Sequence, residues 1–179
     1  MNPWAGRYPR TRARAWQAVV HHAVARAPPP GVFLDVGAWD GGLAAMAQAA
    51  GYEAIAVDAD ADARAQVRAD MESLPLRDGT CRVVALCASL HHAKRPQVAL
   101  AEAARLLGPG GIVALALTPQ GPGHLRTADL RAHLAAHGLV VDVAPFPLGA
   151  LGAWRRAKAA LTRRTYASFP LVLARRPRG

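Results

Sequence analysis

The sequence predicts an α/β protein with a doubly wound, mostly parallel sheet and helices on both faces. Apolar runs typical of buried strands alternate along the 179 residues with segments whose apolar residues have helical spacing. The first run leads through glycines into a helical segment, and the first two runs carry a carboxylate at or near their ends. Open α/β proteins form a ligand crevice in this way, at the carboxyl ends of their strands.

The stretch Val32–Gly42 reads VFLDVGAWDGG and predicts a buried strand followed by a tight turn. The alanine-rich segment Leu43–Ala50 predicts the helix that opens after the turn. Gly37 and Gly41 carry no side chain, so the backbone of the turn can approach a ligand closely.

The second predicted strand, Ala54–Asp58, ends in an acid. A carboxylate at this place suits the two hydroxyls of an adenosine ribose, because it can accept a pair of hydrogen bonds. The segment Ala69–Pro75, reading ADMESLP, is a further signal. The short interval between Asp58 and Asp70 leaves room for a helix of barely two turns.

The remaining elements continue the alternation. Arg82–His92 predicts a buried strand with a polar end, and Leu106–Leu117 predicts a helix stop followed by a strand. Thr127 is a candidate cap for a helix that ends before Gly138. The other predicted elements are a helix over residues 11–27 that stops before Pro28-Pro29-Pro30, a helix Pro96–Leu107, a helix Thr127–His137, a strand Leu139–Val143, a basic helix Gly152–Arg164 and a strand Phe169–Ala174.

This ordered set of motifs resembles the class I S-adenosylmethionine-dependent methyltransferases, of the short group related to the quinone-biosynthesis C-methyltransferases. The family's first strand and turn read roughly hydrophobic-Asp-hydrophobic-Gly-x-Gly-x-Gly, which matches Leu34-Asp35-Val36-Gly37-Ala38-Trp39-Asp40-Gly41. Its Gly-Asp-x-x-x-Leu-Pro block matches Ala69–Pro75. The later matches, which complete a resemblance over residues 32–118, are Ser89-Leu90-His91-His92, Glu102, Arg105 and Leu107-Gly108-Pro109-Gly110-Gly111.

The resemblance implies a Rossmann-like, seven-stranded sheet with an antiparallel last strand, for which Phe169–Ala174 is the candidate. It implies S-adenosylmethionine as the cofactor and methyl transfer to a small-molecule acceptor as the activity. A single domain over residues 1–179 would comprise an N-terminal helical lid (1–30), a cofactor-binding core (31–118) and a C-terminal, substrate-side part of the same sheet (119–179).

By the same resemblance, Asp35 would hold the amino group of the cofactor, Asp58 its ribose and Asp70 its adenine amine. Met71 would pack on the adenine. From the residues alone, Asp35 could instead satisfy turn amides, Asp58 could be a solvated acid at a helix start, and Met71 could be a core residue. The implied cofactor-binding set is Asp35, Gly37, Ala38, Trp39, Gly41, Asp58, Ala59, Asp70, Met71 and Ser89.

Two residues depart from the family pattern. Trp39 stands where the family has its middle glycine, and Asp40 stands where Thr or Ser is usual. Trp39 places an indole where backbone faces the methionine part of the cofactor. Either the loop is rebuilt around a ring that stacks over the ligand, or the ring fills part of the pocket.

The pair His91-His92 follows the predicted fourth strand and is a candidate for acid–base chemistry. Histidine is a natural general base near neutral pH when the acceptor is a hydroxyl or an acidic carbon. Because adjacent residues on an extended strand point opposite ways, we expect only one ring to face the substrate, and we predict His91 as catalytic. The alternative is that one ring fills the crevice wall and the other caps Lys94–Pro96. No cluster of His, Cys and Asp has metal-ligand spacing, so no metal is expected.

Composition is consistent with one compact cytoplasmic domain. The chain has no apolar segment of roughly 18 residues, so no membrane span is expected. Cys81 and Cys87 lack metal-type spacing and indicate buried thiols in a reducing cytosol.

The net charge of +10 is unevenly distributed. All twelve acids lie between Asp35 and Asp142, whereas residues 1–34 carry five basic residues and residues 143–179 carry eight. Such flanks can attract an anionic small-molecule substrate, a nucleic acid or an anionic membrane surface, or they can be a solvated basic surface.

Three functions follow, and methyl transfer to a small molecule is preferred. An RNA or other polyanion methyltransferase, gripping phosphates with the arginines of the flanks, ranks second because no RNA-binding module is visible. In addition, Ala88-Ser89-Leu90-His91 is not the Asp/Asn-Pro-Pro-aromatic motif of enzymes that methylate base amines. The third function is a non-catalytic binding or scaffold protein whose cofactor site is altered by Trp39. The oligomeric state is left open.

Overall fold

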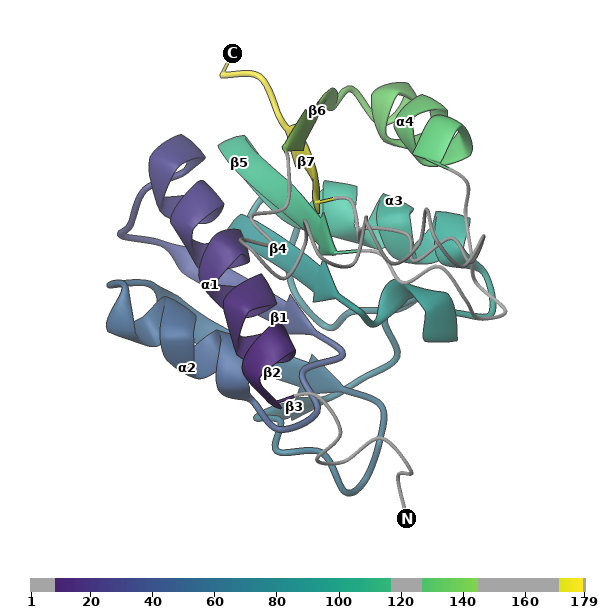
Figure 1. The fold of residues 1–179 in the computed structure, drawn as a ribbon. Coiled ribbons are helices and arrows are strands. Elements are labelled where there is room, and N and C mark those ends of the chain that lie inside the picture. The colour runs from purple at the N-terminus through teal and green to yellow at the C-terminus, as the bar shows by residue number, and fades with distance from the viewer. Residues whose placement is uncertain (1–8, 117–126, 145–170, 179) are drawn as a thin grey trace, which may run out of the picture.

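The computed structural model describes residues 9–116, 127–144 and 171–178, which form a seven-stranded sheet with flanking helices (Figure 1). The strands are β1 (Val32–Val36), β2 (Glu53–Asp58), β3 (Val67–Arg68), β4 (Cys81–Cys87), β5 (Leu107–Ala116), β6 (Val140–Ala144) and β7 (Leu171–Arg175). Their order in the sheet is β3-β2-β1-β4-β5-β7-β6. Only β7 runs against the others, pairing antiparallel with both β5 and β6. The predicted antiparallel last strand is confirmed, and it lies inside the sheet.

Helices cover both faces of the sheet, as predicted (Figure 1). One layer contains α1 (Pro9–Arg26) and α2 (Gly42–Ala49), and the other contains α3 (Pro96–Leu106) and α4 (Thr127–Ala136). Successive side chains of a strand point to opposite faces, so Phe33 of β1 packs in the first layer and Leu34 packs in the second. None of the described helices combines the length and the apolar character needed to cross a membrane.

Seven of the predicted elements begin and end within two residues of helices or strands in the structure. The predicted helix Gly152–Arg164 lies outside the described residues. The seven elements that agree with the prediction within two residues are α1, α2, α3, α4, β2, β6 and β7.

The short helix expected between Asp58 and Asp70 is wrong, because residues 59–66 form turns. Asp58 Oδ1 accepts a hydrogen bond from Asp60 N, and Asp60 Oδ1 accepts one from Asp62 N, both at 2.9 Å. Aspartate side chains that bond backbone two residues ahead compete with helix formation. Two such turns in succession explain why this alanine-rich segment is not helical.

The strand expected over Arg82–His92 is also too long. It ends at Cys87, and Ala88 follows with a φ of +58° that turns the chain away from the sheet. Leu90–His92 then form one turn of 3₁₀ helix, η1. The histidine pair therefore lies on a helical turn and not on a strand.

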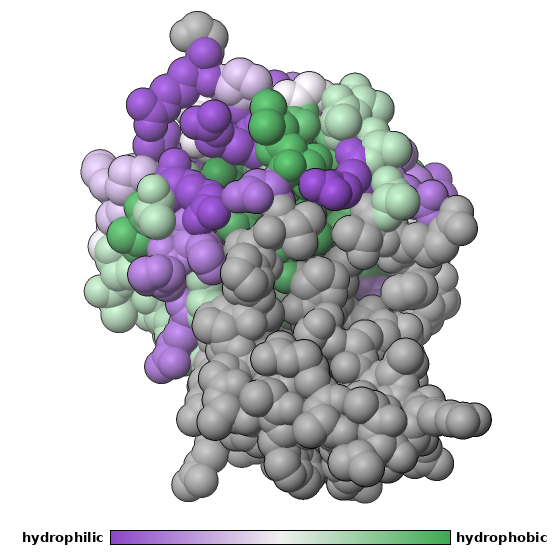
Figure 2. Space-filling model, turned by 45° about the horizontal axis from the view of Figure 1, so that its top comes forward, coloured by the Kyte–Doolittle hydropathy of each residue, from purple (hydrophilic) through white to green (hydrophobic). Residues whose placement is uncertain are grey.

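The parallel strands all begin on one side of the sheet and end on the opposite side, and these two sides have different surroundings. We call the edge where the parallel strands end the carboxyl edge, and the opposite one the amino edge. Figure 2 brings the amino edge forward and shows hydrophilic residues beside an apolar group. The described residues at this edge include Arg82 in β4, Arg175 in β7, Arg176 and Arg178 after β7, and Val140 in β6, which is 58% exposed.

Candidate functional site

The turn after β1 lies against the end of β2 at the carboxyl edge. Gly37 and Ala38 donate their backbone N–H groups to Val57 O, at 2.8 and 3.1 Å. The next residue, Trp39, donates its N–H to Asp58 Oδ2 at 2.9 Å. The predicted glycine turn and the acid of the second strand are thus joined directly.

Gly37 is the point at which this turn meets the segment after β4. Its φ is +76°, and an added Cβ would overlap the Cβ of Ser89. Ser89 is buried, and its hydroxyl donates a hydrogen bond to Val36 O at 2.6 Å. Glycine is required here, because any side chain would displace Ser89. Two of the predicted site residues are therefore in contact across β1 and β4.

Asp35 is a buried carboxylate beneath the turn. It is 2% exposed, and its Oδ2 accepts a hydrogen bond from Ala44 N in the first turn of α2, at 3.1 Å. Burial raises the pKa of this carboxyl to about 7; the hydrogen bond from Ala44 opposes the rise, and the charges of Asp40 and Asp58 add to it. A cation placed beside Asp35 would favour its ionised form. Both interpretations of Asp35, a turn-amide acceptor and a partner for a cation, are compatible with this geometry.

Asp58 is half-buried at the end of β2, and both of its carboxylate oxygens already accept a backbone N–H. The donors are Trp39 N to Oδ2 and Asp60 N to Oδ1, each at 2.9 Å. These bonds fix the direction of the carboxylate. Each oxygen keeps a further lone pair, so the group can still accept two hydroxyls.

Trp39 adopts the backbone conformation that suits glycine. Its φ is +49°, which costs a residue with a side chain about 1 kcal/mol. The hydrogen bond to Asp58 and one from Arg64 N to Trp39 O, at 2.6 Å, hold it in place. The indole is half-buried and is not part of the apolar core clusters of the described residues. The turn thus keeps a left-handed residue where the family pattern has glycine.

Asp70 and Met71 follow β3, next to the end of β2. Ala69 N donates to Asp58 O at 3.1 Å, which brings the two predicted acids to the same edge. Asp70 is exposed, and its Oδ1 accepts a hydrogen bond from Glu72 N at 2.9 Å. Met71 packs against the core cluster under α3, so its interpretation as a core residue has direct support.

The His91 and His92 rings lie close together, with centroids 3.9 Å apart. The expectation that they point opposite ways is wrong, because it assumed a strand and the pair lies on η1. Among the described residues, His91 Nδ1 is buried without a hydrogen-bond partner, whereas the His92 side chain is exposed. Burial, with a smaller effect of the neighbouring His92, lowers the pKa of His91 to about 4. The His91 ring is therefore neutral near pH 7.

The other predicted site residues lie at the same edge. Gly41 has a φ of +72° and precedes α2, and Ala59 is exposed directly after Asp58. Within the described ranges, no group of three or more His, Cys, Asp or Glu residues could hold a metal ion.

A contact between α1 and the glycine turn was not evident from the sequence. An added Cβ at Gly42 would overlap the indole of Trp16, so α1 packs directly on the first residue of α2. The paired glycines Gly41-Gly42 indicate that another group packs closely here, but a local pattern cannot identify the distant residue that does so. α1 therefore supports the same turn that contacts Asp58.

Comparison with known proteins agrees with this arrangement. Residues 34–115 match the family described as a methyltransferase domain. No curated protein matches the sequence.

Three solved structures illustrate the shared fold. The YcgJ protein from Bacillus subtilis is 20% identical, with a TM-score of 0.64, over 92% of this chain and 99% of that chain. DesVI from Streptomyces venezuelae is 15% identical, with a TM-score of 0.68, over 94% and 93% of the two chains. The 1,6-didemethyltoxoflavin-N1-methyltransferase of Burkholderia thailandensis, with 1,6-didemethyltoxoflavin and S-adenosylhomocysteine bound, is 19% identical, with a TM-score of 0.68, over 97% and 83%.

The resemblance to the class I S-adenosylmethionine-dependent methyltransferases that was stated from the sequence is thus confirmed by the methyltransferase-domain match over residues 34–115 and by the shared fold. The narrower relation to quinone-biosynthesis C-methyltransferases stays a prediction.

Proposed function

We propose that this protein transfers a methyl group from S-adenosylmethionine to a small-molecule acceptor at the carboxyl edge of its sheet. The observation that carries the proposal is the position of three acids at this edge: Asp58 binds a turn held in a glycine-like conformation, Asp35 binds the first turn of the following helix, and Asp70 follows the neighbouring strand β3. The cofactor has a cationic end and a hydroxylated end, and carboxylates suit both.

The described residues fit this cofactor. Buried Asp35 would stabilise a positive charge near the turn, because a neighbouring cation favours the ionised form that burial disfavours. Asp58 would accept the ribose hydroxyls through its remaining lone pairs, and Asp70 would accept the adenine amine. The other residues assigned to the cofactor are Gly37, Ala38, Trp39, Gly41, Ala59, Met71 and Ser89.

The bound cofactor would supply a methyl group already activated on a sulfonium. The protein then has to align the acceptor with that group and exclude water. We assign proton removal from the acceptor to His91, whose buried Nδ1 has no partner among the described residues. A ring with a pKa of about 4 is a weak base, so His91 suits an acceptor that loses its proton easily, such as a phenol or an acidic carbon.

A small acceptor is favoured over a polyanion by the arginines that follow β7. Arg175, Arg176 and Arg178 lie at the amino edge, away from the acids of the carboxyl edge. In the Burkholderia thailandensis enzyme, 1,6-didemethyltoxoflavin is bound together with S-adenosylhomocysteine. We extend small-molecule acceptors to this protein, and an anionic acceptor is one candidate. The proposal also includes a cytoplasmic location and a single domain with an N-terminal helical lid.

Calorimetric titration with S-adenosylhomocysteine tests the cofactor assignment. We expect binding by the unaltered protein and a loss of about 1–3 kcal/mol in Asp58→Ala, because the ribose hydrogen bonds disappear. Asp62→Ala is the matched control, since Asp62 is an exposed acid on the same segment. Unchanged affinity in a folded Asp58→Ala protein would contradict the assignment.

Trp39→Gly separates this function from the non-catalytic alternative. If the indole blocks the pocket, S-adenosylhomocysteine should bind only to the variant. If the cofactor fits beside the indole, the unaltered protein should bind as well. Binding confined to the variant would favour a scaffold role.

A further inference from the structure

We propose that Arg105 and Glu102 of α3 are positioning residues that hold the adenine side of the cofactor site. They act through the segment of residues 70–80, which begins with Asp70 and Met71. This inference rests on the proposed function, because it assumes that Asp70 and Met71 meet the adenine.

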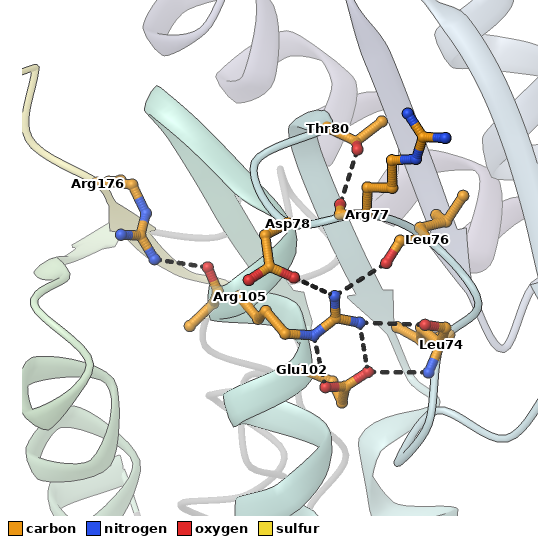
Figure 3. Close-up of polar contacts among 9 residues, drawn as sticks. Leu74, Leu76, Arg77, Asp78, Thr80, Glu102, Arg105 and Arg176 are labelled. Atoms are coloured by element: carbon orange, nitrogen blue, oxygen red, sulfur yellow. Dashed lines mark hydrogen bonds and ion pairs between the residues drawn. The ribbon is translucent and has the colours of Figure 1, made fainter.

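The Arg105 guanidinium grips this segment with two of its nitrogens (Figure 3). Nη1 donates to Leu76 O at 2.9 Å and to Asp78 Oδ1 at 2.6 Å. Nη2 donates to Leu74 O at 3.1 Å and to Glu102 Oε2 at 2.8 Å, and Nε donates to Glu102 Oε1 at 2.8 Å. The planar fork of arginine suits such a pattern, and a lysine ammonium could not reproduce it.

Glu102 completes the grip on the backbone of Leu74. Its Oε2 accepts a hydrogen bond from Leu74 N at 2.9 Å, so both backbone groups of Leu74 are bound by the pair. The Leu74 side chain is 5% exposed and belongs to the core cluster under α3. The backbone of Arg105 adds a bond from Gly79 N at 3.1 Å. The middle of the segment is thereby fixed to one helix.

Short-range bonds carry this placement from Leu74 to Asp70. Ser73 N donates to Asp70 O at 3.0 Å, and Glu72 N donates to Asp70 Oδ1 at 2.9 Å. Glu72 is itself held at the start of α3, where it accepts bonds from Arg95 N at 2.6 Å and from Arg95 Nε at 2.8 Å. Asp70 therefore lies between β3 on one side and two anchors on α3 on the other.

The ion pair is favourable where it stands. The side chains of Arg105 and Glu102 are 30% and 18% exposed, so solvent screens them less than an open surface pair. The hydrogen bonds from Arg105 lower the pKa of Glu102, which keeps the pair charged at neutral pH. Asp78 contributes less, because its side chain is 78% exposed.

Arg105→Lys and Arg176→Lys provide a matched test. Arg176 donates to Ala104 O on the same helix at 2.7 Å, and no hydrogen bond from its side chain to residues 70–80 is seen in the described structure (Figure 3). We expect Arg105→Lys to weaken S-adenosylhomocysteine binding about tenfold by calorimetry, because a small displacement of Asp70 misaligns its acceptor oxygen. Arg176→Lys should leave the affinity unchanged, even if both variants lose similar stability in urea.

A double-variant cycle with Asp70→Asn shows whether Arg105 acts through the segment. In the Asp70→Asn background, Arg105→Lys should cause at most a twofold further loss of affinity. Hydrogen exchange of the backbone amides of residues 70–73 should also become faster in Arg105→Lys, and this can be measured without a ligand. Full additivity, equal losses in Arg105→Lys and Arg176→Lys, or unchanged exchange would each overturn the proposal. Absence of binding to the unaltered protein would instead contradict the proposed function, and this inference would fall with it.

Discussion

At the carboxyl edge of the sheet, the first three strands end in or beside the acids Asp35, Asp58 and Asp70. At the amino edge, the described residues around the start of β5 include Arg82, Arg175, Arg176 and Arg178. Asp35 is buried and Asp58 is half-buried against the glycine turn, whereas Arg175 and Arg178 are exposed. The two edges of one sheet therefore differ in the sign of these charges and in how deeply the charged groups are buried.

Because of this difference, the net charge of the protein does not indicate which ligand charge the proposed site favours. The value of +10 would by itself favour an anionic ligand, but the carboxyl edge is the part that fits a cation. The net charge does not reveal this separation, because parallel strands begin on one side of the molecule and end on the opposite side. Arg82, Arg175, Arg176 and Arg178 would attract a polyanion to the edge away from the proposed methyl transfer.

The largest effect should appear in the pH dependence of stability. Because the folded pKa of Asp35 is raised to about 7, its contribution is fully present below the unfolded pKa of about 4 and is lost as pH rises through 7. The total loss is on the order of 4 kcal/mol. Urea unfolding of the unaltered protein between pH 4 and pH 8 measures it, and Asp35→Asn should remove most of this slope.

Asp142→Asn, in the outer strand β6, is the control. Its carboxylate pairs with Arg26 but is 63% exposed, so its loss should change stability by less than about 1 kcal/mol. A slope that survives in Asp35→Asn would mean that other groups carry the pH dependence, and the two edges would not differ in this respect.

A smaller effect compares one glycine at each edge. Gly37 and Gly110 have φ values of +76° and +72°, so alanine should cost about 1 kcal/mol of backbone strain at either position. At Gly37 the new Cβ also overlaps buried Ser89, which should add about 2 kcal/mol. At Gly110 it lies 3.1 Å from Cγ and Nε of Arg178, an exposed side chain that can move.

Thermal or urea unfolding of Gly37→Ala and Gly110→Ala measures the difference directly. Equal destabilisation would show that the amino edge is as tightly packed as the carboxyl edge. If Gly37→Ala does not fold, expression with Gly110→Ala as the folded reference still ranks the two positions.

The smallest effect is expected for the double variant Arg175→Ala/Arg178→Ala. Both side chains are exposed, so stability should change by less than about 0.5 kcal/mol, and S-adenosylhomocysteine affinity should stay the same. Elution from heparin should move to lower salt, since two arginine contacts to its anionic groups are removed. A loss of cofactor affinity would show that the amino edge influences the site, against the separation described above.

Much of the fold was predictable because its signals are local. Apolar runs and glycine stops involve neighbours in sequence, and the ends of most corresponding elements lie within two residues of the predicted ones. The failed helix at residues 59–66 had a local cause too: the spacing of Asp58, Asp60 and Asp62 forms consecutive turns. The histidine pair was misplaced because the positive φ of Ala88 has no signature in an alanine.

The site was predictable only as a set of residues. Matching the motifs identified Asp35, Asp58, Glu102 and Arg105, but it could not tell which backbone groups they bind. Those contacts join residues far apart in the chain, as when Arg105 holds Leu74 and Leu76. Which of them touches a ligand stays a prediction until the variants are measured.

The place of β7 between β5 and β6 has a consequence for the order in which the chain can fold. A ribosome delivers β5 and β6 before β7, and among the described strands β6 pairs only with β7. Until residues 171–175 emerge, β5 has an open flank and β6 has no neighbour to join. The half of the sheet that carries the glycine turn can assemble early, while the other half must wait for its central strand.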